Sequence, residues 1–235
     1  MRRLMLFLFL TALLTAQSAP EVEITAEPHH HLVFANDQVR VFNVDVAPHS
    51  ETLLHRHGHD YFYVMFGASE IVNAVQGKDP VNVKLHDAQV GFTPGAFVHV
   101  VRNLDQPFRN VTVELLQDDK LRQSSAKWDE DRGLEILNGG TQEILFVKDG
   151  VRASEIELQP GGMMPGVEHA GPMLLIALSE IGRLSEGPKN HVRMAIDQQD
   201  VAGRSGDTVW LLRGRGHGWF NAGNKPAKFV TLEFP

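Results

Sequence analysis

The chain has 235 residues, of which 43% are hydrophobic, and a formal net charge of −7. This composition is ordinary for a globular protein, and the length allows one large or two small domains. The negative charge argues against nucleic acid as a partner. The chain contains no cysteine, which excludes disulfides, thiolate metal ligands and cysteine nucleophiles.

The first eighteen residues have the organisation of a signal peptide. A short basic stretch, Met1-Arg2-Arg3, precedes an apolar run from Leu4 to Leu14, and Ala16-Gln17-Ser18 offers small residues for cleavage. The apolar run is too short for a good membrane span, so we predict a signal peptide over residues 1–18 and a periplasmic or secreted mature protein without a membrane anchor. The alternatives are a buried first helix or an uncleaved anchor.

The rest of the chain reads as short β-strands separated by turn signals. Residues 39–46 alternate along their length, and the segments 61–66, 98–101 and 111–116 are rich in aromatic and β-branched residues. Asp149-Gly150 lies between two further strand-like segments and predicts a tight hairpin. Together with 21 Gly and 12 Pro, this pattern favours an all-β sandwich or barrel.

One pattern occurs twice. Val39-Arg40 matches Val151-Arg152, Pro48 matches Pro160 and His57 matches His169, each pair 112 positions apart; His99-x3-Asn103 matches His217-x3-Asn221 at a spacing of 118. Such self-similarity predicts two copies of one structural unit. We therefore expect a first barrel over 29–117, a polar linker over 118–140 that includes a short helix near 125–131, and a second barrel over 141–235.

The first copy contains a histidine cluster built like a metal site. Alternate residues of a strand point to the same face, so His55 and His57 share a face with His59 and Tyr61 if the strand is regular. His99 on a later strand can complete a trio around one cation. Imidazole is a good ligand for Fe, Mn, Zn, Ni and Cu alike, so the trio predicts a divalent metal without choosing it.

These motifs resemble those of the cupin family. The cupin first motif, G-x5-H-x-H-x(3,4)-E-x6-G, is matched at His55, His57 and Gly67, and the second, G-x5-P-x-G-x2-H-x3-N, at Pro94, His99 and Asn103, with the glycine one place early at Gly95. The resemblance covers nearly all of the mature chain and implies two tandem cupin barrels, each a double-stranded β-helix or jelly roll. Because cupins carry out many functions, it implies the fold more strongly than the activity.

The chain departs from the family at the motif glutamate. Positions 61 and 62 hold Tyr61 and Phe62, and the nearest carboxylate is Asp60, on the opposite face of a regular strand. The resemblance then implies a three-histidine site, as in cupins that resemble thiol or diketone dioxygenases. Asp60, His59 or Tyr61 remains open as a replacement ligand, and Tyr61 is also a candidate catalytic residue or a strand aromatic that packs the barrel.

The other candidates are weaker. Phe62, Tyr63, Phe92 and Phe97 are candidates to line a pocket beside the site. In the second copy only His169 and His217 remain, because Val167 and Met173 replace His55 and Tyr61, so we expect a degenerate site there and a structural or dimerising role. The run His29-His30-His31 is able to bind metal adventitiously, but it lies at the start of the mature chain and we expect it to be exposed.

Two functions follow as expectations. The first is an exported metal-dependent enzyme, oxygenase-like, acting on a small organic acid or chelating substrate. The second is a non-catalytic bicupin that binds a small ligand or stabilises an assembly. For either function, the resemblance to cupins makes a homodimer a candidate assembly. The sequence shows no phosphate-binding loop, Walker motif or Gly-x-Ser-x-Gly elbow to support a nucleotide-binding or hydrolase function.

Overall fold

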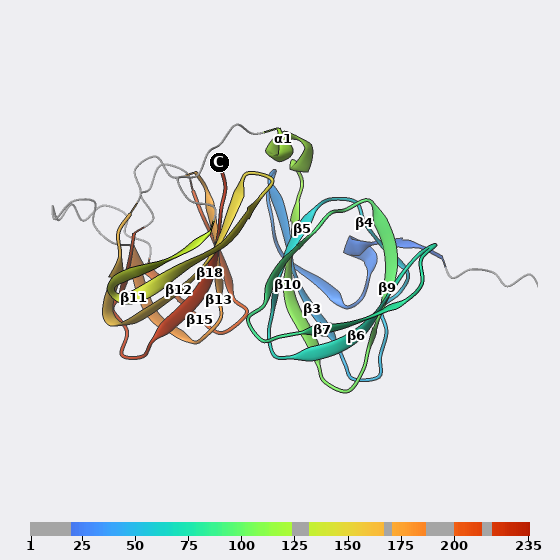
Figure 1. The fold of residues 1–235 in the computed structure, drawn as a ribbon, viewed down its shortest axis with the longest axis horizontal. Coiled ribbons are helices and arrows are strands. Elements are labelled where there is room, and N and C mark those ends of the chain that lie inside the picture. The colour runs from blue at the N-terminus through green and yellow to red at the C-terminus, as the bar shows by residue number, and fades with distance from the viewer. Residues whose placement is uncertain (1–19, 124–131, 167–170, 187–199, 213–217) are drawn as a thin grey trace, which may run out of the picture.

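The computed structural model describes residues 20–123, 132–166, 171–186, 200–212 and 218–235. These residues form strands almost throughout, as expected; the helical elements among them are the 3-10 helix η1 (Ile24–Ala26) and the α-helix α1 (Asp118–Arg122). No helix in this part of the chain combines the length and apolarity needed to cross a membrane. Two barrel-like units lie side by side, with the N-terminal half in blue and green and the C-terminal half in yellow and red (Figure 1).

The first unit is made of two five-stranded sheets, with strand orders β1-β4-β9-β6-β7 and β2-β3-β10-β5-β8. Its strands are β1 (Val22–Glu23), β2 (His30–Ala35), β3 (Val39–Val46), β4 (His55–His57), β5 (Tyr61–Met65), β6 (Ser69–Val75), β7 (Val81–Leu85), β8 (Val90–Thr93), β9 (Phe97–Asn103) and β10 (Phe108–Leu115). Strand β3 has the predicted bounds, because the buried side of its alternating pattern faces the interior.

The second unit is one eight-stranded sheet in the order β15-β14-β17-β12-β18-β13-β16, with β11 paired to β12. Its strands are β11 (Gly133–Lys148), β12 (Val151–Met164), β13 (Met173–Ala177), β14 (Ile181–Glu186), β15 (Asp200–Gly203), β16 (Thr208–Leu211), β17 (Trp219–Asn221) and β18 (Ala227–Glu233). Strand β11 therefore begins inside the segment predicted as a linker. The helix observed there is α1, and the helix predicted near 125–131 lies outside the described residues.

The hairpin between β11 and β12 forms at the predicted turn. Asp149 and Gly150 have φ angles of 50° and 71°. Positive φ at both central residues is what a type I′ hairpin turn requires, and the aspartate-glycine pair tolerates it. The turn therefore fixes the register in which the two long strands pair.

The repeat seen in the sequence has a structural counterpart at the motif asparagine. Asn103 donates from Nδ2 to the carbonyl oxygen of Val46 at 2.7 Å, and Asn221 donates from Nδ2 to that of Leu158 at 2.9 Å. Val46 and Leu158 are 112 positions apart, as the sequence repeat requires. The asparagine therefore ties the same two strands together in each barrel and is structural rather than a ligand.

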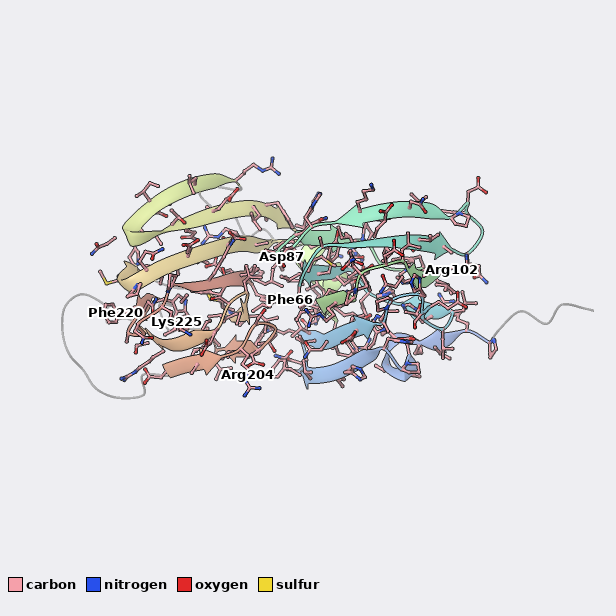
Figure 2. All side chains as sticks on the ribbon, turned by 90° about the horizontal axis from the view of Figure 1, so that it is seen from below. Phe66, Asp87, Arg102, Arg204, Phe220 and Lys225 are labelled. Atoms are coloured by element: carbon pink, nitrogen blue, oxygen red, sulfur yellow. The ribbon has the colours of Figure 1, made fainter. Side chains whose placement is uncertain are left out.

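The two barrels share an apolar contact layer. One buried cluster draws residues from both: Val39, Val41, Phe62, Val64, Val111, Val113 and Leu115 from the first, and Val151, Ala153, Leu174, Ile176, Val230, Leu232 and Phe234 from the second. Phe62 stacks on Phe146 across it, with ring centroids 6.0 Å apart. Phe66 packs against the same cluster and lies where the two units meet, whereas Arg102 lies on the far side of the first barrel (Figure 2).

Candidate metal centre

Neighbouring strands bring the three predicted histidines together inside the first barrel. Strands β4 and β9 are antiparallel, and His55 lies opposite His99 in their register. The relative exposures of His55, His57 and His99 are 0%, 2% and 5%. The Nε2 atoms of His55 and His99 are 3.0 Å apart, and the ring of His57 lies 5.1 Å and 5.0 Å from theirs.

A fourth histidine, His30, joins them. This corrects the expectation of exposure for His30, whereas His31 in the same run is exposed as expected. His30 is buried, and its ring centroid lies 4.8 Å from that of His55. One ligand-capable nitrogen from each of His30, His55 and His57 lies within 4.8 Å of the others. The compact trio thus includes His30, while His99 joins through His55.

The N-terminal segment reaches the site because it adds a strand beside β4. Val22 of β1 pairs in parallel with His55, and Ile24 is buried in the apolar core of the first barrel. The chain then turns through η1 and delivers His30 at the start of β2. The sequence feature that indicates a role for His30 is Glu27, a carboxylate three residues earlier. Both residues lie outside the two cupin motifs, so a comparison of motifs does not find them.

Three of the four rings have a hydrogen-bond acceptor at Nδ1. The acceptors are the Leu53 carbonyl oxygen for His55 at 2.8 Å, Asn73 Oδ1 for His99 at 2.8 Å and Glu27 Oε2 for His30 at 2.6 Å. An acceptor at Nδ1 fixes the proton there and leaves the Nε2 lone pair free. This is the outer-sphere arrangement of metal-binding histidines.

The contact between His55 and His99 fits a shared cation. With both protons held at Nδ1, two Nε2 lone pairs face each other at 3.0 Å and repel unless a positive charge lies between them. Metal–imidazole bonds of about 2.1 Å meeting at a right angle give a nitrogen–nitrogen separation of about 3.0 Å. The buried Nδ1 of His57 has no hydrogen-bond partner among the described residues.

Two of the four histidine rings are anchored by Glu27, which is 2% exposed. Its carboxylate accepts from the His29 amide at 2.8 Å, from His29 Nδ1 at 2.9 Å and from the Leu53 amide at 3.1 Å, in addition to His30. Burial by itself raises the pKa of Glu27, but these hydrogen bonds outweigh it and lower the pKa to about 2. Glu27 therefore orients His30 directly and His55 through the Leu53 backbone.

Burial keeps the imidazoles of His55, His57 and His99 neutral. Desolvation, followed by the neighbouring histidines, lowers the pKa of His55 to about 4 and that of His99 to about 3, and it lowers the pKa of His57 as well. A metal ligand must be deprotonated, so rings that are neutral at physiological pH are ready to bind a cation.

The histidines form part of the wall of a cavity of about 220 Å³ inside the first barrel. Its lining is His30, Val44, Thr52, His55, His57, Tyr61, Tyr63, Met65, Ile71, Asn73, Val83, Leu85, Thr93, His99, Val101, Phe108, Asn110 and Thr112. Tyr63 therefore lies where it was expected.

Three of the expected pocket aromatics do not line this cavity. Phe92 and Phe62 pack edge to face at 5.1 Å in the layer between the barrels, because their side of strands β8 and β5 faces the second barrel. Phe97 stacks on the ring of His57 at 5.3 Å instead and supports that ligand from behind.

The candidates for the missing glutamate have other contacts, because strand β4 ends at His57. His59 does not share the face of strand β4 that His55 and His57 present to the cavity, and its Nδ1 lies 3.6 Å from Oδ1 of Asp118. Asp60 accepts from the Gly95 amide at 2.7 Å and pairs with Arg122, so neither residue lines the cavity.

Tyr61 does line the cavity, with its ring stacked 4.4 Å from that of His57. Burial raises the pKa of its phenol, and Thr93 is its hydrogen-bond partner. The group therefore remains a neutral phenol, which makes it a poor anionic ligand and a good ring support.

The second barrel is filled where the first is hollow. Trp219 and Phe229 occupy the strand positions that Val101 and Asn110 hold in the first barrel, and both are fully buried. Met173, at the position of Tyr61, belongs to the same apolar cluster. His169 and His217 lie outside the described residues.

Comparison with solved structures identifies the fold. The oxalate decarboxylase from Bacillus subtilis at pH 4.6 matches with a TM-score of 0.60 and 12% identity, covering 84% of this chain and 68% of that one. Another structure of that enzyme, concerned with its Mn(II) centres, matches with a TM-score of 0.60 and 12% identity over 89% and 75% of the two chains.

No family model matches the sequence, and no curated protein does. The cupin fold expected from the two motifs is nevertheless confirmed by the structural matches. At this level of identity they show the fold alone.

Proposed function

We propose that the first barrel binds one divalent metal ion through His30, His55, His57 and His99, and that a small organic molecule is bound and transformed in the adjoining cavity. The observation that carries the proposal is the pair of opposed Nε2 atoms of His55 and His99, 3.0 Å apart in a buried site whose outer nitrogens are already held by acceptors. The Mn(II) centres of the oxalate decarboxylase with the same fold support it.

The metal would supply Lewis acidity to a bound oxygen and, if redox-active, oxygenase-like chemistry. The residues of the chain position the ligand and exclude water. Glu27 and Asn73 hold two of the rings, Tyr61 and Phe97 stack on a third, and the apolar wall shields the site. Such positioning is a large part of catalysis in enclosed sites.

The second candidate is a non-catalytic binding protein. It is favoured by one observation: no carboxylate or lysine is among the described cavity-lining residues, so the histidines and phenols are the titratable groups available for proton transfer there. Oxygen consumption or product formation with a chelating substrate would decide for the enzyme. Ligand-induced thermal stabilisation without turnover would decide for the binding protein.

We also propose that the protein acts outside the cytoplasm, on the basis of the signal-peptide pattern in residues 1–18, and that its first barrel is the functional one. Fractionation of cells that express the full chain, followed by N-terminal sequencing of the exported form, tests the first point. An unprocessed N-terminus in the cytoplasmic fraction would contradict it.

The test of the metal site is the metal content of the purified full chain. After loading with Mn²⁺, Zn²⁺ or Co²⁺ and dialysis, we expect about one ion per chain in the wild type and in His49→Ala, whose imidazole is largely exposed. His55→Ala should lose the ion, because His55 contacts each of the other three rings. A wild type without stoichiometric metal would overturn the proposal.

A further inference from the structure

We infer, on the basis of the proposed metal site, that the natural ligand is a small molecule with a single negative charge and an apolar body, and that the buried charge of Glu27 selects against dianions. Two independent features of the first barrel lead to this class of ligand. One is the composition of the cavity wall, and the other is the number of charges around the histidines.

Half of the residues that line the cavity, other than the histidines, are apolar, and the rest are neutral polar residues. Val44, Met65, Ile71, Val83, Leu85, Val101 and Phe108 line it, and no lysine or arginine is among the lining residues that the structure describes. The volume of about 220 Å³ is that of about seven water molecules at about 30 Å³ each. The cavity therefore suits a short carbon skeleton and offers no side-chain cation to a second carboxylate.

Several polar groups of the wall already have hydrogen-bond partners within the protein. Asn73 Oδ1 faces His99, Asn110 Oδ1 accepts from Thr112, and Thr52 Oγ1 accepts from the Val101 amide. These neutral groups orient a ligand but do not balance a charge. Any charge on the ligand must therefore be balanced at the histidine end.

The charges at that end add to one positive unit when a divalent ion is bound. The imidazole ligands are neutral, and the Glu27 carboxylate lies directly behind His30 with its side chain fully buried. Glu114, another buried carboxylate of the first barrel, is paired with Arg40 at 2.9 Å. A monoanionic ligand brings the site to neutrality, whereas a dianion leaves one negative charge uncompensated in a low-dielectric interior, which is costly.

The experiment compares three probes on the metal-loaded full chain by calorimetry at pH 8, where ordinary imidazoles are neutral. Pyruvate and oxalate are similar in size and both chelate through two oxygens, but they differ by one charge. 3-Methyl-2-oxobutanoate keeps the charge and the donor oxygens of pyruvate and adds two methyl groups. Each Kd is divided by the Kd of the same probe for the free cation in water.

After each Kd has been divided by the Kd for the free cation, we expect pyruvate to bind at least tenfold more tightly than oxalate. The branched acid should bind roughly tenfold more tightly than pyruvate, from burial of about 0.8 kcal/mol per added carbon. In Glu27→Gln, which keeps the shape and removes the charge, the preference for pyruvate over oxalate should fall at least tenfold. Glu51→Gln, at an exposed pair with Arg102, should leave it unchanged.

The outcomes separate the two proposals. A wild type that retains no metal overturns the proposed function. A wild type that retains metal but prefers oxalate, or binds the branched acid no better than pyruvate, overturns this inference and leaves the metal site standing. If Glu27→Gln fails to fold, the wild-type preferences still decide, and a folded Glu27→Gln with an unchanged preference removes the role assigned to Glu27.

Discussion

Acidification should destabilise the metal-free protein through its buried histidines. In the folded state the pKa values of His55 and His99 are about 4 and about 3, against 6.5 when unfolded. Between these values the unfolded chain binds protons that the folded chain does not, so the free energy of unfolding falls as the pH drops below about 6.5 and the loss levels off only below the folded pKa. Above about pH 7 these histidines cost nothing.

The magnitude follows from the distance between the assay pH and 6.5. An assay at pH 5 lies about 1.5 pH units below 6.5. Over that interval each of the two histidines lowers the free energy of unfolding by about 2 kcal/mol, and the pair lowers it by about 4 kcal/mol. His57 acts in the same direction. Asp149 acts in the opposite direction, because burial and Asp60 raise its pKa to about 6 and the folded chain therefore binds its proton first. Its contribution to the free energy of unfolding is smaller than that of the histidines because the residue is partly exposed.

Urea unfolding of the metal-free chain at pH 7 and pH 5, followed by tryptophan fluorescence, measures the effect. We expect His99→Gln to lose about 2 kcal/mol less than the wild type over this range, because one buried imidazole is gone. His49→Gln should behave as the wild type does. Equal losses in the wild type and in His99→Gln would refute the reasoning that the buried cluster sets the acid sensitivity.

Three further substitutions probe the supports of the site. Asn73→Leu removes the acceptor at one ligand ring and should weaken metal binding about 10–100-fold in a chelator competition assay, and unchanged affinity would contradict its role. Gly95→Ala places a Cβ about 2.3 Å from the backbone of His59, so the thermal midpoint should fall clearly; a wild-type midpoint would show that the turn adjusts. Arg40→Leu leaves Glu114 buried without its cation and should cost about 3–5 kcal/mol in urea unfolding, whereas adding Glu114→Leu should restore most of it; equal stability of the single and double variants would argue against the pair.

Local patterns were sufficient to predict much of the fold. The alternation over Val39–Val46 and the Asp149-Gly150 pair predicted a strand and a hairpin that the structure contains, because period and turn geometry depend on neighbouring residues. The internal repeat likewise predicted equivalent strands. The extent of β11 was not predicted, because the segment 118–140 as a whole is polar and charged and was taken as a linker, although Leu134, Ile136 and Leu137 within it are apolar. The pairing of β11 with β12 begins at Asn138, inside that segment.

The site was predictable where its residues share one strand or one motif. His55 and His57 follow from strand periodicity, and His99 from the second motif. His30 and Glu27 do not, because their position depends on a two-residue parallel pairing of β1 with β4 that no sequence pattern specifies. The prediction that Phe92 lines the cavity was wrong, because strand β8 has two partly buried faces. One faces the cavity, and the other, which carries Phe92, faces the second barrel.

The central claim is that four imidazoles share one cation, and a crystal structure of the Zn²⁺- or Mn²⁺-loaded chain with anomalous data at the metal edge tests it most directly. We predict a single strong peak inside the first barrel, with one nitrogen each of His30, His55, His57 and His99 about 2.0–2.2 Å away. A loaded crystal with no peak there, or with the ion held by exposed residues elsewhere, would contradict the account.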